Sequence, residues 1–180
     1  MYDKEAHQKA ADEAIRLLRI RGRVAMGNPP VYVNVRCTEP VLDALKTFYP
    51  QIDQDKWSWL TDVTIGIGAG FSGMGEVCGG VSGEILAIGA DIVSRYRETA
   101  LQRFFMIKYV QKFMRDVTNK FGSVQCRDII APHDISGCLA PGGDEAYKAW
   151  MDSGMSNAPG KCADIMHYAI MYPLPFEDEE

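Results

Sequence analysis

Five cysteines are the residues of this sequence best suited to chemistry. Thiolates bind soft metals, and a pair of thiols can cycle between dithiol and disulfide. The five are spread over most of the chain and their number is odd, so a purely structural set of disulfides does not account for them. No Cys-x2-Cys pair occurs, so a metal site must be assembled from distant segments. The cysteines are Cys37, Cys78, Cys126, Cys138 and Cys162.

Two of these cysteines are expected at the beginning of helices. Cys37 precedes Thr38, a plausible N-cap, and Cys78 follows a glycine-rich loop in the first turns of the next helix. Amide donors and the positive end of a helix favour thiolate over thiol. The sequence therefore predicts two low-pKa thiols and candidate catalytic residues, Cys78 and Cys37. The alternative for any single cysteine is that it is a small buried hydrophobic residue.

A row of glycines surrounds Cys78. Gly75, Gly79 and Gly83 recur at i, i+4 and i+8, which gives one smooth face of a helix. Each interior glycine costs about 1 kcal/mol in helix propensity, so the row indicates that something needs the space. Another helix, a backbone segment or an inorganic cluster could approach there, and the three glycines are candidate cofactor-binding residues.

Other chemistries have weaker signals. Residues 68–73 match G-x-G-x-x-G after the apolar stretch 63–67, with Asp91 further on, but the chain then continues as helix where a dinucleotide fold needs a second strand. No G-x-S-x-G or H-E-x-x-H spacing indicates a hydrolase. His133 and His167 could join thiolates around a metal, although a lone histidine is more often simply exposed.

The cysteine segments resemble a known family. Residues 73–83 around Cys78, with Cys37 upstream and residues 121–128 around Cys126 downstream, are similar to the C_GCAxxG_C_C family of redox-active proteins. The resemblance covers about 35–168. It implies a small helical protein with four characteristic cysteines, and a related domain lies beside a non-haem iron or iron–sulfur centre in split-Soret cytochromes.

The resemblance also assigns the cysteines. It matches Cys37 to the first family cysteine, Cys78 to the motif cysteine, Cys126 to the third and Cys162 to the last. Cys138 is then an extra cysteine or an alternative fourth ligand. The sequence departs from the family motif at position 80, where it has glycine and the family usually has alanine.

The remaining pattern predicts an all-α, single-domain helical bundle over 1–180, with a glycine-rich loop at 66–75 and at most short strands near Val31–Val35 and Val63. The helix 97–121 is expected to be the core helix, through an apolar face. The other expected helices are 4–21, about 38–49, 76–96, 144–151 and 160–171. The expected core face of 97–121 consists of Ala100, Phe104, Ile107, Met114, Val117 and Phe121.

Net charge and the distribution of apolar residues limit the classes of binding partner. The net charge is −5 and the chain ends in the acidic residues 177–180, which argues against nucleic acid. No stretch has the roughly 18 apolar residues of a membrane span, and residues 1–14 are too polar for a signal peptide. We expect a cytoplasmic protein, or a periplasmic one if an export signal was removed.

Together these features favour one function over two alternatives. The leading hypothesis is an iron–sulfur protein for electron transfer or redox sensing, with cysteine ligands and a redox partner protein. The first alternative is a thiol–disulfide oxidoreductase in which Cys78 attacks and Cys37 or Cys126 resolves. The second is a structural or regulatory subunit with core cysteines, whose glycine row serves helix packing or homodimerisation.

Overall fold

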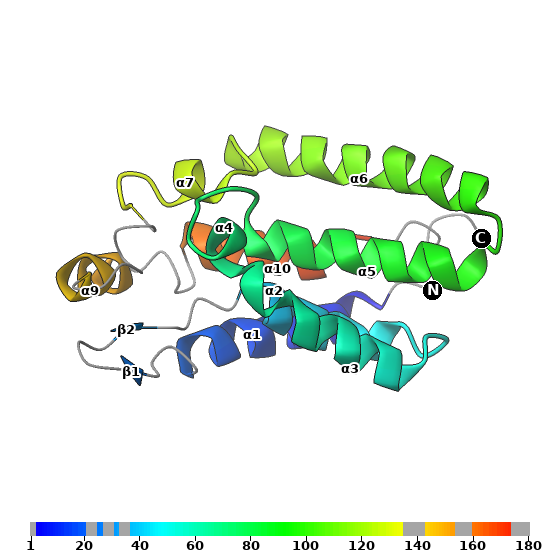
Figure 1. Ribbon diagram of the computed structural model, residues 1–180, viewed down its shortest axis with the longest axis horizontal. Helices are drawn as coiled ribbons and strands as arrows, with labels where there is room; N and C mark the ends of the chain where they lie inside the picture. Colours follow the sequence, from blue (N-terminus) through cyan, green and yellow to red (C-terminus); the bar gives the residue numbers. More distant parts are fainter. Residues whose placement is uncertain are drawn as a thin grey trace.

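The computed structural model describes residues 3–20, 25–26, 31–32, 37–134, 143–153 and 160–173. Regular structure in these ranges is helical, apart from one antiparallel ladder of two residues per strand, which confirms the all-α prediction. The elements, seen in Figure 1, are α1 (Lys4–Ile20), β1 (Ala25–Met26), β2 (Val31–Tyr32), α2 (Thr38–Leu45), η1 (Lys46–Phe48), α3 (Gln54–Val63), η2 (Thr64–Gly66), α4 (Gly68–Phe71), α5 (Gly79–Arg95), α6 (Thr99–Phe121), α7 (Cys126–Ile129), α9 (Asp144–Asp152) and α10 (Lys161–Ile170).

Helix α5 lies at the centre of the bundle. It packs against α2, α10 and α6, while α1 covers α2 and α10 (Figure 1). Ile88 and Ile92 of α5 are fully buried, as are Leu42 of α2 and Ile165 of α10. Burying one such side chain stabilises the fold by about 1.5–3 kcal/mol. The core therefore fixes α2, α5 and α10 relative to one another.

Glycines allow α5 to approach α2 closely. A Cβ added at Gly83 would lie 2.9 Å from Val41 Cβ, and one added at Gly79 would lie 2.8 Å from Cys37 Cβ. The close approach predicted from the glycine row is thus present at these two residues. Gly75 lies outside the helix, with φ +73°, and a Cβ there would lie 2.9 Å from Arg127 Cβ. Its place on a helix face was predicted wrongly.

The expected face of α6 is wrong in part. Phe104 and Ile107 are 61% and 59% exposed, whereas Tyr109, Phe113 and Val117 are buried. Apolar residues occupy more than one face of this helix, and only the face toward α5 and α10 is covered. Helix α6 therefore flanks the bundle core and does not form its centre (Figure 1).

Two local predictions also need correction. The stretch 63–67 belongs to the end of α3 and to η2, so the G-x-G-x-x-G segment follows a helix and lacks the strand that a dinucleotide site requires. Helix α5 begins at Gly79, three residues later than expected, because the backbone of 75–78 pairs with 124–127.

Other boundaries agree closely with expectation. The predicted helices 4–21, 144–151 and 160–171 are present as α1, α9 and α10, within one residue at each end. Of the predicted strand 31–35, β2 covers the first two residues and the rest lies outside the described ranges. No helix in the part of the chain described here has the length and apolar character needed to cross a membrane.

Candidate functional site: a buried cluster of four cysteines

Four cysteines lie at the beginnings of four helices. Cys37 is the N-cap of α2, Cys78 is the N-cap of α5, Cys126 is the first residue of α7 and Cys162 is the second residue of α10. All four are free thiols and all are buried, with 6–9% of each residue exposed. Cys138, the fifth cysteine, lies outside the described residues.

The four thiols gather at one place. Burial raises the pKa of each, and neighbouring sulfur charges raise the pKa of Cys37, Cys126 and Cys162 further. The pKa of Cys37 is raised by charge on Cys78, Cys162 and Cys126, that of Cys162 by Cys78 and Cys126, and that of Cys126 by Cys78. Every pair among the four therefore interacts electrostatically, although the chain separates them by many residues.

Backbone amides point at two of the sulfurs. The N–H groups of Gly80 and Val81 donate hydrogen bonds to the Cys78 sulfur, and the Ala69 N–H donates to the Cys37 sulfur. These donors lower the pKa of each thiol, as expected at a helix beginning, but burial has the larger effect and the net pKa is raised. The prediction of low-pKa thiols is therefore wrong, because removing a thiolate from water costs more than these amide donors return.

A short backbone bridge brings two of the cysteines together. Val77 and Gln125 form an isolated antiparallel bridge, and Cys78 and Cys126 each follow one of its residues. The Cys78 N–H donates to the Val124 carbonyl at 2.8 Å. The extended backbone before α5 is thereby joined to the start of α7.

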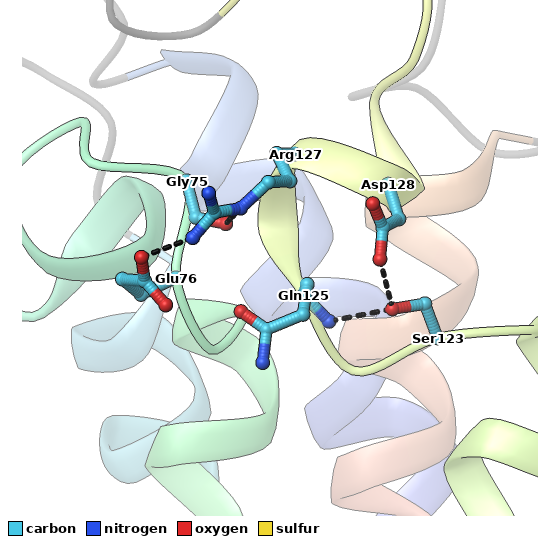
Figure 2. Close-up of polar contacts among 6 residues, drawn as sticks. All are labelled: Gly75, Glu76, Ser123, Gln125, Arg127 and Asp128. Carbon is cyan, nitrogen blue, oxygen red and sulfur yellow. Dashed lines mark hydrogen bonds and ion pairs between the residues drawn. The ribbon is translucent and has the colours of Figure 1, made fainter.

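Arg127 also joins the segment before α5 to the start of α7. Its backbone N–H and its Nε both donate to the Gly75 carbonyl, at 3.0 and 3.1 Å, and its guanidinium pairs with the Glu76 carboxylate (Figure 2). The Cys126 N–H donates to the Glu76 carbonyl at 2.6 Å. The positive φ of Gly75 and its contact with Arg127 explain why glycine stands at this position.

A second group of contacts orders the approach to α7. Ser123 Oγ accepts the Gln125 N–H at 2.9 Å and donates to Asp128 Oδ2 at 2.7 Å (Figure 2). Sequence reasoning missed this turn and the Arg127 contacts. The signal that could have suggested them is the run of polar residues on both sides of Cys126, directly after the glycine that ends α6.

Of the two histidines named as candidate metal ligands, His167 has another contact, since its Nε2 lies 3.0 Å from Gln8 Oε1 of α1. The backbone N–H of His133 donates to the Ile130 carbonyl in the turn after α7. Among the described residues, no group of three or more His, Cys, Asp or Glu side chains is arranged to hold a metal ion.

The fold and the site define an all-α protein with four buried cysteines gathered at helix beginnings. A family model described as "Putative redox-active protein (C_GCAxxG_C_C)" matches residues 35–172, a range that contains all five cysteines. The chain belongs to the C_GCAxxG_C_C family, and this membership supports a general redox role. Neither the curated proteins nor the solved structures contain a match to the chain.

Proposed function

We propose that Cys37, Cys78, Cys126 and Cys162 together hold an iron–sulfur cluster, through which the protein transfers electrons or senses redox state. The observation that carries this proposal is the mutual interaction of four buried thiols from four helices. Four thiolates are the ligand set that such clusters take. When bound, the cluster supplies one-electron chemistry.

The surroundings of the thiols suit such a group. Several thiolates in one buried site would repel each other, and a cationic iron–sulfur core offsets both this repulsion and the loss of water. Binding then releases the thiol protons. The N–H groups directed at the sulfurs of Cys37 and Cys78 would hydrogen-bond ligated sulfur and tune the reduction potential.

The backbone bridge supports a second candidate, a dithiol–disulfide couple between Cys78 and Cys126. Oxidation of the pair would form one sulfur–sulfur bond while the disulfide of a partner protein is broken, and that partner would take up the two electrons and two protons as a dithiol. Burial raises the pKa of Cys78 and raises that of Cys126 to about 12, so little thiolate is present to begin the exchange. The cluster is therefore the preferred proposal.

Metal analysis of protein purified without oxygen tests the proposal. We expect iron and acid-labile sulfide in the wild type, with an absorption band near about 400 nm from sulfur-to-iron charge transfer. Replacing Cys37, Cys78, Cys126 or Cys162 singly with serine should remove the band. The matched control is Cys138→Ser, which should retain it.

Other results would redirect the assignment. Loss of the band in Cys138→Ser but not in Cys162→Ser would make Cys138 the fourth ligand. A colourless wild type without metal, whose free-thiol count rises on reduction, would support the disulfide couple. A colourless protein whose thiol count does not change would leave the cysteines as core residues.

A further inference from the structure

A cavity of about 490 Å³ lies between α3 and the C-terminal half of α5. Its lining includes the apolar side chains of Trp57, Leu60 and Val93. From Cys78, the N-cap of α5, to Ala90 in the cavity lining, the helix rises about 18 Å at 1.5 Å per residue. In Figure 1, this end of α5 lies away from α4 and α7. The cavity is therefore separate from the cysteine cluster.

Two cations line the cavity from different elements. Lys56 lies on α3, and Arg97 lies just after α5. Within the described ranges, neither the Lys56 ammonium nor the Arg97 guanidinium forms a hydrogen bond or an ion pair with another side chain. Both groups are thus available to a ligand.

The acidic residue of the lining is already engaged. Asp53 lines the cavity, but its carboxylate accepts the backbone N–H groups of Asp55 and Lys56 at 2.9 and 3.3 Å as the N-cap of α3. Because Lys56 and Arg97 outnumber this single carboxylate, the charge of the lining is positive.

Behind the lining lies the buried carboxylate of Asp91. Its Oδ1 accepts from Gln51 Nε2 at 2.9 Å and from Arg95 Nε at 2.8 Å. The amide of Gln51, a lining residue, is thereby held in place, and the charge of Asp91 is balanced by Arg95. The Gln51 side of the cavity wall is therefore anchored to the buried Asp91 carboxylate.

We propose that this cavity binds a small organic anion with an apolar body, such as an aromatic or branched aliphatic carboxylate. The carboxylate would pair with Lys56 and Arg97, and arginine can hold it through two parallel hydrogen bonds. The apolar body would lie against Leu60 and the exposed Val93. The volume lies within the roughly 300–1,000 Å³ of small-molecule pockets.

The test is an amide-resolved NMR titration of the full chain with phenylacetate, and with phenylacetamide as the neutral analogue. We expect phenylacetate to shift the amide signals of Gln51, Lys56, Leu60 and Ser94 selectively. It should bind about tenfold more tightly than phenylacetamide, which loses the ion pairs with Lys56 and Arg97, two exposed cations whose pairs are each weak.

Variants separate the ionic contribution from apolar contact. The double variant Lys56→Gln with Arg97→Gln should weaken phenylacetate binding about tenfold and leave phenylacetamide binding unchanged. Arg103→Gln, which removes an exposed cation on α6, should change neither.

Three results would overturn the proposal. These are the lack of selective shifts at millimolar phenylacetate, shifts that map to another surface, and equal affinity for the acid and the amide. None of these readouts depends on iron, so the outcome is independent of the proposed cluster.

Discussion

Replacing Gly79 with alanine is expected to loosen the contact that positions Cys37. The new Cβ would lie 2.8 Å from Cys37 Cβ, 2.9 Å from Thr38 Oγ1 and 3.3 Å from Gly68 Cα. The first and last of these atoms are fixed to the backbone and cannot rotate away. The beginning of α2 or the segment around Gly68 must therefore move, and the Cys37 sulfur moves with it.

The magnitude follows from two opposing effects. Overpacking a close contact costs about 1–3 kcal/mol. Alanine gains at most about 1 kcal/mol over glycine in helix propensity, and less at Gly79 because it is the first residue of α5. We expect Gly79→Ala to lower the free energy of unfolding by about 1–2 kcal/mol, measured by urea denaturation of the reduced, metal-free protein and followed by circular dichroism.

Gly89→Ala is the matched control on the same helix. Its added Cβ would meet Met106 Cε at 3.5 Å, an ordinary contact with the end of a flexible side chain. This variant should be unchanged or more stable by up to about 1 kcal/mol. If Gly79→Ala proved as stable as Gly89→Ala, the inference that α2 and α5 meet through a glycine-dependent contact would be refuted.

Three further predictions concern the same site. Gly80→Ala introduces the residue that is usual in the family and should change the free energy of unfolding in urea by less than about 1 kcal/mol. The nearest atom to the added Cβ would be Cγ of the flexible Met166 side chain, at 3.1 Å. A larger loss of stability would show that Met166 cannot move aside. Burial raises the pKa of Cys126 from about 9 to about 12, so at about pH 8.5 the folded, metal-free protein should alkylate there about a thousandfold more slowly than the urea-unfolded chain. Equal alkylation rates of Cys126 in the folded and unfolded protein, measured by mass-spectrometric mapping, would contradict this expectation. Because the folded-state pKa is raised, Cys126 contributes stability that is complete below about pH 9 and is lost as pH rises toward about 12. Arg127→Met removes an exposed ion pair with Glu76 and a side-chain hydrogen bond to Gly75. It should lower the free energy of unfolding by about 1 kcal/mol or less and speed amide hydrogen exchange at Cys78 and Cys126. Unchanged exchange would show that the backbone bridge forms without the Arg127 side chain.

Local pattern was sufficient for most of the fold. Helix periodicity and end signals located α1, α9 and α10, because these are short-range properties of the chain. The buried face of α6 could not be chosen in this way, since Phe104 and Phe113 are both apolar and only the position of α5 and α10 decides which is covered. The start of α5 likewise depends on a partner segment that lies more than 40 residues later.

The candidate site was also predictable only in part. The types of its residues, and the assignment of Cys37, Cys78, Cys126 and Cys162, followed from the family resemblance. The raised pKa of these thiols did not, because the helix beginnings were visible in the sequence while the depth of burial was not. The Arg127 contacts with Gly75 also depend on long-range geometry that spacing alone does not encode.

The most direct test of the central claim is the intact mass of the anaerobically purified protein under native conditions, compared with its mass after denaturation. The cluster proposal predicts a native mass that exceeds the sequence mass by that of an iron–sulfur core, and loss of this increment in Cys78→Ser but not in Cys138→Ser. A native mass equal to that of the sequence, or lower by two hydrogens for each disulfide, would contradict it.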